Sequence, residues 1–113
     1  MAKYLNRKVK YEGIEFVSRK EAARYKELEL LERGKDIYNL QTQVKFLLIP
    51  SQKIDGKVVE RPTYYVADFV YHRASDDSLV VEDVKSPMTR KLPCYVMKRK
   101  LMLKEHGLQI HEV

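Results

Sequence analysis

The sequence has one cysteine, no tryptophan and no apolar run long enough to cross a bilayer. Cys94 is the only thiol among the 113 residues, which excludes an internal disulfide framework and a cysteine-based zinc cluster. The longest apolar stretches, such as FLLI at 46–49, fall far short of the roughly 20 residues that a membrane helix needs. The N-terminus has no signal-peptide pattern. We therefore expect a single soluble domain of the cytoplasm, with no membrane partner.

Acidic residues are absent from two basic segments, residues 1–10 and 86–104. Overall, 22 basic residues outnumber 16 acidic ones, and the formal net charge is +6. A basic surface of this kind favours a polyanionic partner such as a nucleic acid. A solvated, lysine-rich surface with no such partner is the plainer alternative.

Turn signals, helix caps and apolar periodicity predict the order of the elements. In sequence these are a hairpin at 9–17, a helix from Ser18 to Gly34, a strand at 42–49, a projecting hairpin loop at 51–62, strands at 63–72 and 79–85, a helix at 95–107 and a last strand at 108–113. Three consecutive strands followed by a helical crossover predict an α/β fold with a mixed sheet flanked by helices. The single domain 1–113 thus divides into a basic N-terminal hairpin at 1–17 and an αβββαβ core at 18–113.

Two acids and a lysine stand in otherwise apolar strands. Asp68 lies in YYVADFVY, and Asp83 and Lys85 end the run LVVEDVK. An unpaired carboxylate is costly to bury, so the pattern favours a ligand for these groups, most simply a divalent metal ion. Side-chain alternation places Asp83 and Lys85 on one face of their strand and Glu82 on the other. The alternative is a buried ion pair of one acid with Lys85, which leaves the second acid unexplained.

Glu21 and Gln43 are further polar candidates from other elements. Glu21 shares a helix face with Tyr25 and Leu28, so it is expected to face the sheet. It also stands three residues after Ser18, and a capping-box role explains that spacing equally well. Gln43 either extends the polar cluster from the first strand or is an ordinary strand-end glutamine.

Nitrogen and sulfur ligands for a metal are scarce in this chain. Its three histidines, His72, His106 and His111, are scattered along the sequence, and only His72 shares the strand face of Asp68. Oxygen ligands favour a hard cation, so Mg²⁺ or Mn²⁺ is expected. No small-molecule organic cofactor is expected.

The order of elements and acids resembles the PD-(D/E)XK nuclease superfamily, the fold of many restriction endonucleases and archaeal Holliday-junction resolvases. The shared features are an acid near the start of the first helix, then an Asp and an Asp/Glu-X-Lys motif on successive strands, then a helix and a strand. More narrowly, FVSRKEAARY, Gln43, YVADFVY and EDVKS resemble a small phage and prophage family of endonucleases. Ala67 stands where the superfamily has a proline before the aspartate, and that proline is not a ligand.

The resemblance implies a restriction-endonuclease-like domain that hydrolyses DNA phosphodiester bonds with Mg²⁺ or Mn²⁺. It implies that Asp68, Asp83 and the backbone carbonyl of Val84 bind the metal, with Glu21 binding directly or through water. Lys85 would orient the attacking water or help to deprotonate it. Branched or junction DNA is one substrate, and a homodimer one assembly, found among superfamily members of this size; the host would be a bacterial cell.

Basic residues in two loops are the candidate DNA contacts. They are Arg90, Lys91 and Lys98 after the motif strand, and Lys53, Lys57 and Arg61 in the hairpin loop. Two other classes of function stay open at this point. One is a non-catalytic nucleic-acid-binding module with the same fold, and the other is a structural adaptor in which the acids and Lys85 form a buried network.

Overall fold

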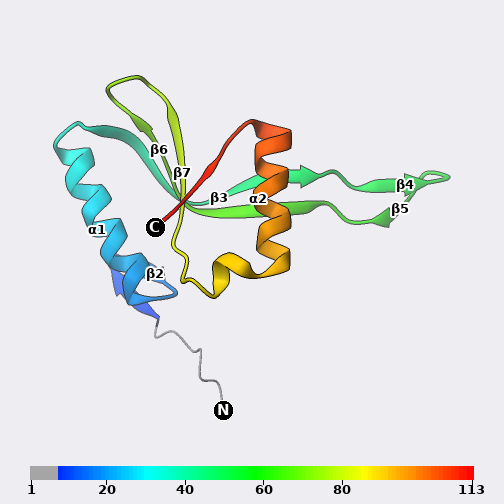
Figure 1. The fold of residues 1–113 in the computed structure, drawn as a ribbon, viewed down its shortest axis with the longest axis horizontal. Coiled ribbons are helices and arrows are strands. Elements are labelled where there is room, and N and C mark those ends of the chain that lie inside the picture. Colours follow the sequence, from blue (N-terminus) through cyan, green and yellow to red (C-terminus); the bar gives the residue numbers. More distant parts are fainter. Residues whose placement is uncertain (1–7) are drawn as a thin grey trace, which may run out of the picture.

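The computed structural model describes residues 8–113, which form an α/β domain with an N-terminal hairpin, a mixed sheet and two helices (Figure 1). Lys3 and Arg7 of the predicted basic hairpin lie outside the described residues. The elements are β1 (Val9–Tyr11), β2 (Ile14–Phe16), α1 (Arg19–Arg33), β3 (Ile37–Ile49), β4 (Gln52–Ile54), β5 (Lys57–Glu60), β6 (Thr63–Arg73), β7 (Leu79–Asp83), the 3-10 turn η1 (Thr89–Lys91), α2 (Pro93–His106) and β8 (Ile110–Glu112).

The central sheet has the strand order β3-β6-β7-β8. β6 pairs antiparallel with β3 and β7, whereas β8 pairs parallel with β7 after the chain has crossed over through α2. The predicted mixed sheet with flanking helices is therefore confirmed. Among residues 8–113, no helix is long and apolar enough to cross a membrane.

Four predicted element boundaries are wrong by two residues or more, including that of the last strand, β8, which begins at Ile110 and not at residue 108. β3 begins at Ile37 and not at residue 42, because Ile37 is buried and pairs with Arg73 at the far end of β6. β7 ends at Asp83, so Lys85 lies in the following loop and not in the strand. α2 begins at Pro93, two residues before the predicted range, since proline has no N–H to lose in the first turn of a helix.

The ends of both helices follow the capping signals in the sequence. The Ser18 hydroxyl accepts a hydrogen bond from the backbone N–H of Glu21 at 3.1 Å and so begins α1. α2 ends at Gly107, whose φ of 66° is the left-handed conformation favoured at a helix C-terminus. These caps fix the residue at which α1 begins and the residue at which α2 ends.

The core is divided into two clusters, one under each helix. Tyr65 and Ala67 belong to the cluster that includes Met102 of α2, whereas Phe69 and Tyr71 belong to the cluster that includes Leu28 of α1. In a regular strand all four β6 residues would point to one side. The two faces of β6 therefore exchange at residue 68: beyond it Val70 packs in the α2 cluster, while Phe69 and Tyr71 pack in the α1 cluster.

A strained residue lies opposite this change in β6. Gln43 sits in β3 between Thr42, which pairs with Phe69, and Val44, which pairs with Ala67. Its backbone φ is 53°, in the left-handed region that side-chain-bearing residues rarely adopt. Such conformations persist where the surrounding structure requires them, often at functional sites. Here the strain lies beside Asp68.

Candidate active site

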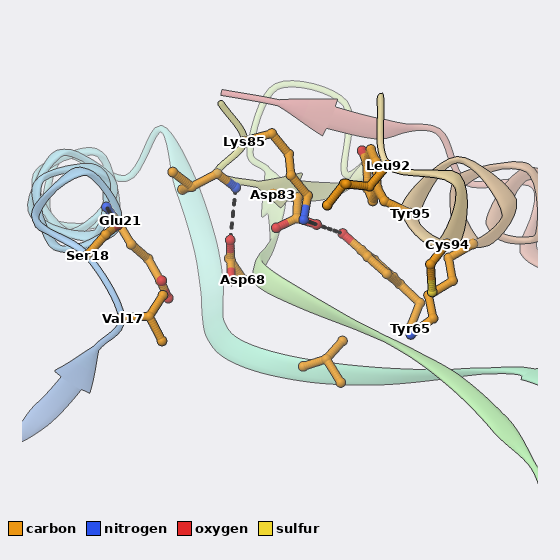
Figure 2. A pocket seen from close by; sticks show the side chains of 13 residues that line it. Val17, Ser18, Glu21, Tyr65, Asp68, Asp83, Lys85, Leu92, Cys94 and Tyr95 are labelled. Atoms are coloured by element: carbon orange, nitrogen blue, oxygen red, sulfur yellow. Dashed lines mark hydrogen bonds and ion pairs between the residues drawn. The ribbon is translucent and has the colours of Figure 1, made fainter. Parts of the chain in front are cut away.

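A cavity of about 450 Å³ opens between α1 and α2, over the middle of β6 and the end of β7. It brings together four of the predicted site residues, Glu21, Asp68, Asp83 and Lys85, from three separate segments of the chain. Figure 2 shows Asp68 and Asp83 between Glu21 on α1 and Tyr95 on α2. The complete lining is Val17, Ser18, Glu21, Tyr65, Val66, Asp68, Asp83, Val84, Lys85, Leu92, Cys94, Tyr95 and Lys98.

Hydrogen bonds orient both aspartates. Asp68 accepts from the backbone N–H of Val84 at 2.9 Å and from Gln43 Nε2 at 3.3 Å. Asp83 Oδ2 accepts from the Tyr65 hydroxyl at 2.7 Å and lies 3.3 Å from Lys85 Nζ. Both carboxyl groups line the same cavity, and Asp68 is near enough to Asp83 to contribute to its raised pKa. A shared cavity is the first geometric condition that a metal site at these two residues must meet.

The protonation of the site depends on its burial. Asp83 is only 4% exposed, and this burial, together with the neighbouring Asp68, raises the pKa of Asp83 to about 7, although Tyr65 and Lys85 act in the opposite direction. Burial also raises the pKa of Glu21, with a smaller contribution from the Asp83 charge. Positive charge supplied from outside would stabilise the ionised forms of both groups.

The raised pKa of Asp83 predicts that the metal-free protein loses stability as the pH rises. Its ordinary value is near 4, so between about pH 4 and pH 7 the folded state binds more protons than the unfolded state, and the free energy of unfolding falls. Urea unfolding in EDTA at pH 5 and pH 8 should show a decline up to about 3 kcal/mol larger for the wild type than for Asp83→Asn. Parallel pH profiles would contradict this assignment.

Lys85 is held at both its backbone and its side chain. Its N–H donates to Val113 O at 3.1 Å, and Lys20 Nζ donates to its carbonyl at 3.1 Å. Its ammonium group lies 4.4 Å from the centre of the Tyr95 ring, an attractive cation–π distance. These contacts hold Lys85 beside Asp83 although it lies in the loop after β7 and not in the strand.

Tyr65, Tyr95 and Glu112 were missed in the sequence. The Tyr95 hydroxyl donates to Glu112 Oε2 at 2.5 Å. Glu112 of β8 thus orients Tyr95, whose ring contacts the ammonium group of Lys85. Regular alternation places Tyr65 and Asp68 on opposite faces of one strand, and only the change in β6 brings them together. The weak available signal for Tyr95 was a polar aromatic residue in the first turn of an otherwise basic and apolar helix.

Glu82 faces away from the cavity, as alternation predicted. It is 2% exposed, and it accepts from Arg24 Nε at 2.8 Å and Arg24 Nη2 at 2.7 Å. The Tyr71 hydroxyl also donates to this carboxylate. Glu82 is therefore satisfied by protein groups, whereas Asp83 faces the cavity.

The predicted basic contacts are placed in three different surroundings. Lys98 lines the cavity, Lys91 is exposed on η1, and Arg90 Nε lies 3.7 Å from Glu112 Oε1. Lys53, Lys57 and Arg61 are exposed on or beside the hairpin of β4 and β5, which projects from the body of the domain (Figure 1).

No histidine belongs to the lining of the cavity. His72 stacks on Tyr38 with ring centres 5.0 Å apart, where β6 pairs with the start of β3. It therefore shares a strand with Asp68 but not a site. His106 Nε2 lies 2.7 Å from Leu47 O.

The donor set fits a hard divalent cation with few protein ligands. Within residues 8–113, no three His, Cys, Asp or Glu side chains group closely enough to hold a metal ion by themselves. The site offers the Asp68 and Asp83 carboxylates, and Gln43 links Asp68 to Glu21 through its amide, 3.2 Å from Glu21 Oε1. Mg²⁺ commonly uses one or two carboxylates and keeps several waters.

Comparison with known proteins gives a family without an assigned activity. No curated protein and no solved structure matches the chain. A family model described as protein of unknown function (DUF1064) matches residues 1–111, which is nearly the whole sequence, and the chain therefore belongs to the DUF1064 family.

Proposed function

We propose that the protein is a Mg²⁺- or Mn²⁺-dependent endonuclease that hydrolyses DNA, with a PD-(D/E)XK-type site on a restriction-endonuclease-like core. One observation carries the proposal: Asp68, Asp83 and Lys85 line a single cavity, and Lys85 Nζ lies 3.3 Å from Asp83 Oδ2. The order of the elements and the mixed sheet agree with the same resemblance.

Asp68, Asp83 and the backbone carbonyl of Val84 are the groups that would hold the metal ion. A bound divalent ion activates water at neutral pH and neutralises charge on the phosphate. The chain itself orients the two carboxylates through Tyr65, Gln43 and the Val84 N–H. Glu21 is the third carboxyl group of the cavity. The Gln43 amide links it to Asp68 by donating a hydrogen bond to each.

Lys85 supplies positive charge where negative charge develops during phosphodiester cleavage. Its ammonium group lies between the Asp83 carboxylate and the Tyr95 ring, so it is already in position before the substrate binds. A fixed cation of this kind stabilises charge on the phosphate and orients the attacking water with little reorganisation. Lys98 adds a second cation from α2 at the same cavity.

The test is cleavage of supercoiled plasmid and of a synthetic four-way junction in Mg²⁺, Mn²⁺ or EDTA. Metal-dependent cleavage is expected for the wild type, and Lys85→Ala should lower its rate by about 10²-fold or more while DNA binding persists. Lys104→Ala removes the same charge from an exposed position near the end of α2, and it should cleave like the wild type.

The two alternative functions give different outcomes in the same experiment. Binding without cleavage in any metal identifies a non-catalytic nucleic-acid-binding module and overturns the proposal. Neither binding nor cleavage favours an adaptor whose acids and lysine form a structural network.

A further inference from the structure

The hairpin of β4 and β5 stands free of the domain. Every residue from 50 to 62 is exposed, and Figure 1 shows the hairpin extending away from α2 at the end of β3 and β6. Three large apolar side chains lie on it, with exposures of 64% for Ile54, 54% for Val58 and 52% for Val59. Because an isolated two-stranded hairpin is only marginally stable in water, such an extension is explained best by a partner.

The hairpin continues an uncovered sheet face that begins at the cavity. In β3 and β6, Phe46 and Tyr65 point toward the α2 cluster, so their strand neighbours point away from it. These outward residues pair across the strands as Leu47 with Tyr64 and Lys45 with Val66, and all four are exposed. Val66 also lines the cavity. We call this face and the hairpin, residues 45–66, the arm.

The charge of the arm is complementary to a polyanion. Its cations are Lys45, Lys53, Lys57 and Arg61, against the acids Asp55 and Glu60. Lys45 Nζ lies 4.7 Å from the centre of the Tyr64 ring. This contact holds the ammonium group of Lys45 on the sheet face between the cavity and the hairpin. Each strand of the hairpin mixes apolar and basic residues, a composition suited to base edges and methyl groups flanked by phosphates.

We propose that the arm lies along duplex DNA and places the β4–β5 hairpin in the major groove, about one helical turn from the scissile phosphate. The inference rests on the proposed nuclease function and adds a second point of contact to it. The 11 residue steps from Asp68 to Lys57 span about 36 Å at ~3.3 Å per residue, close to one turn of DNA at about 34–36 Å. The major groove admits a two-stranded ribbon.

The test shortens the arm without opening the sheet. Ile49 pairs with Thr63, so replacement of residues 50–62 by Asn-Gly closes a two-residue hairpin turn. Affinity for linear duplexes of increasing length is measured in EDTA, and cleavage in Mg²⁺. For the wild type, affinity should rise steeply until the duplex covers about one turn beyond the site, whereas the shortened variant should bind long DNA about 10-fold more weakly and lose this length dependence.

A variant that removes only the charges of the hairpin tests for direct contact with DNA without shortening the arm. Lys53→Ala/Lys57→Ala/Arg61→Ala should lower the slope of log affinity against log salt by about 3, since each phosphate contact contributes about 0.9. Arg33→Ala/Arg73→Ala/Lys104→Ala removes three exposed charges from outside the arm, and it should leave both the slope and the length dependence nearly unchanged.

The outcomes distinguish failure of this inference from failure of the nuclease proposal. If the wild type neither binds nor cleaves DNA, both fail. If it cleaves but the shortened variant keeps the same length dependence, the arm does not contact DNA and only this inference is overturned. Sedimentation velocity tests whether the arm binds a second copy of the chain instead of DNA. If the shortened variant changes its oligomeric state but keeps the wild-type length dependence, the arm is a contact between copies of the chain, and this inference is overturned.

Discussion

Asp83→Asn is expected to lower the rate of metal-dependent DNA cleavage by about 10³-fold or more, with little loss of folding stability. Asparagine keeps the shape of the side chain and an oxygen that can accept the Tyr65 hydrogen bond. It removes the negative charge that would hold the cation and that attracts Lys85 at 3.3 Å. Single-turnover experiments in Mg²⁺ measure the loss of cleavage rate. Calorimetric titration with Mn²⁺ measures the loss of cation binding separately.

Asp68→Asn should have an effect of the same order, because its carboxyl group lines the same cavity as Asp83. Asp77→Asn is the matched control, since Asp77 is exposed beside Tyr38 and its backbone φ of 57° is one that asparagine tolerates. The control should cleave at the wild-type rate. If Asp83→Asn kept metal-dependent cleavage, or if Asp77→Asn lost it, the acid pair would not be the catalytic site.

Local signals were enough to predict the order of the elements and the face of the acid motif. Ser18 and Gly107 mark helix ends through capping chemistry that involves only near neighbours in sequence. Alternation separated Asp83 from Glu82 because β7 is regular up to its last residue. Adjacent side chains of any regular strand point to opposite faces of the sheet, so Glu82 and Asp83 must face opposite ways.

The groups that support the site depended on tertiary structure and could not be predicted in this way. Tyr65 reaches Asp83 because β6 changes its packing partner at residue 68, opposite a strained Gln43. Nothing in a strand pattern signals a left-handed residue in its middle. Glu112 supports Tyr95 across 17 positions of sequence, which only the crossover through α2 brings together.

The second large effect is expected at the buried ion pair behind the site. Arg24→Met should lower the free energy of unfolding by about 3–5 kcal/mol, because it leaves the carboxylate of Glu82 buried without its charged partner. Glu82 is 2% exposed and receives two hydrogen bonds from Arg24, whereas Tyr71 contributes only a neutral hydroxyl. Urea unfolding at pH 7 measures the loss, and Glu27→Gln, at the exposed partner of Arg24, should change stability by about 0.5 kcal/mol or less.

Removal of both charges distinguishes a structural pair from a catalytic one. Arg24→Met/Glu82→Leu should be more stable than Arg24→Met alone, since an apolar pair carries no desolvation cost. Its cleavage rate should stay within a few fold of the wild type at a temperature where both are folded, because Glu82 faces away from the cavity. A double variant that is folded but inactive would move Glu82 into the catalytic machinery. Retained activity would show that two adjacent acids, Glu82 and Asp83, serve stability and chemistry separately.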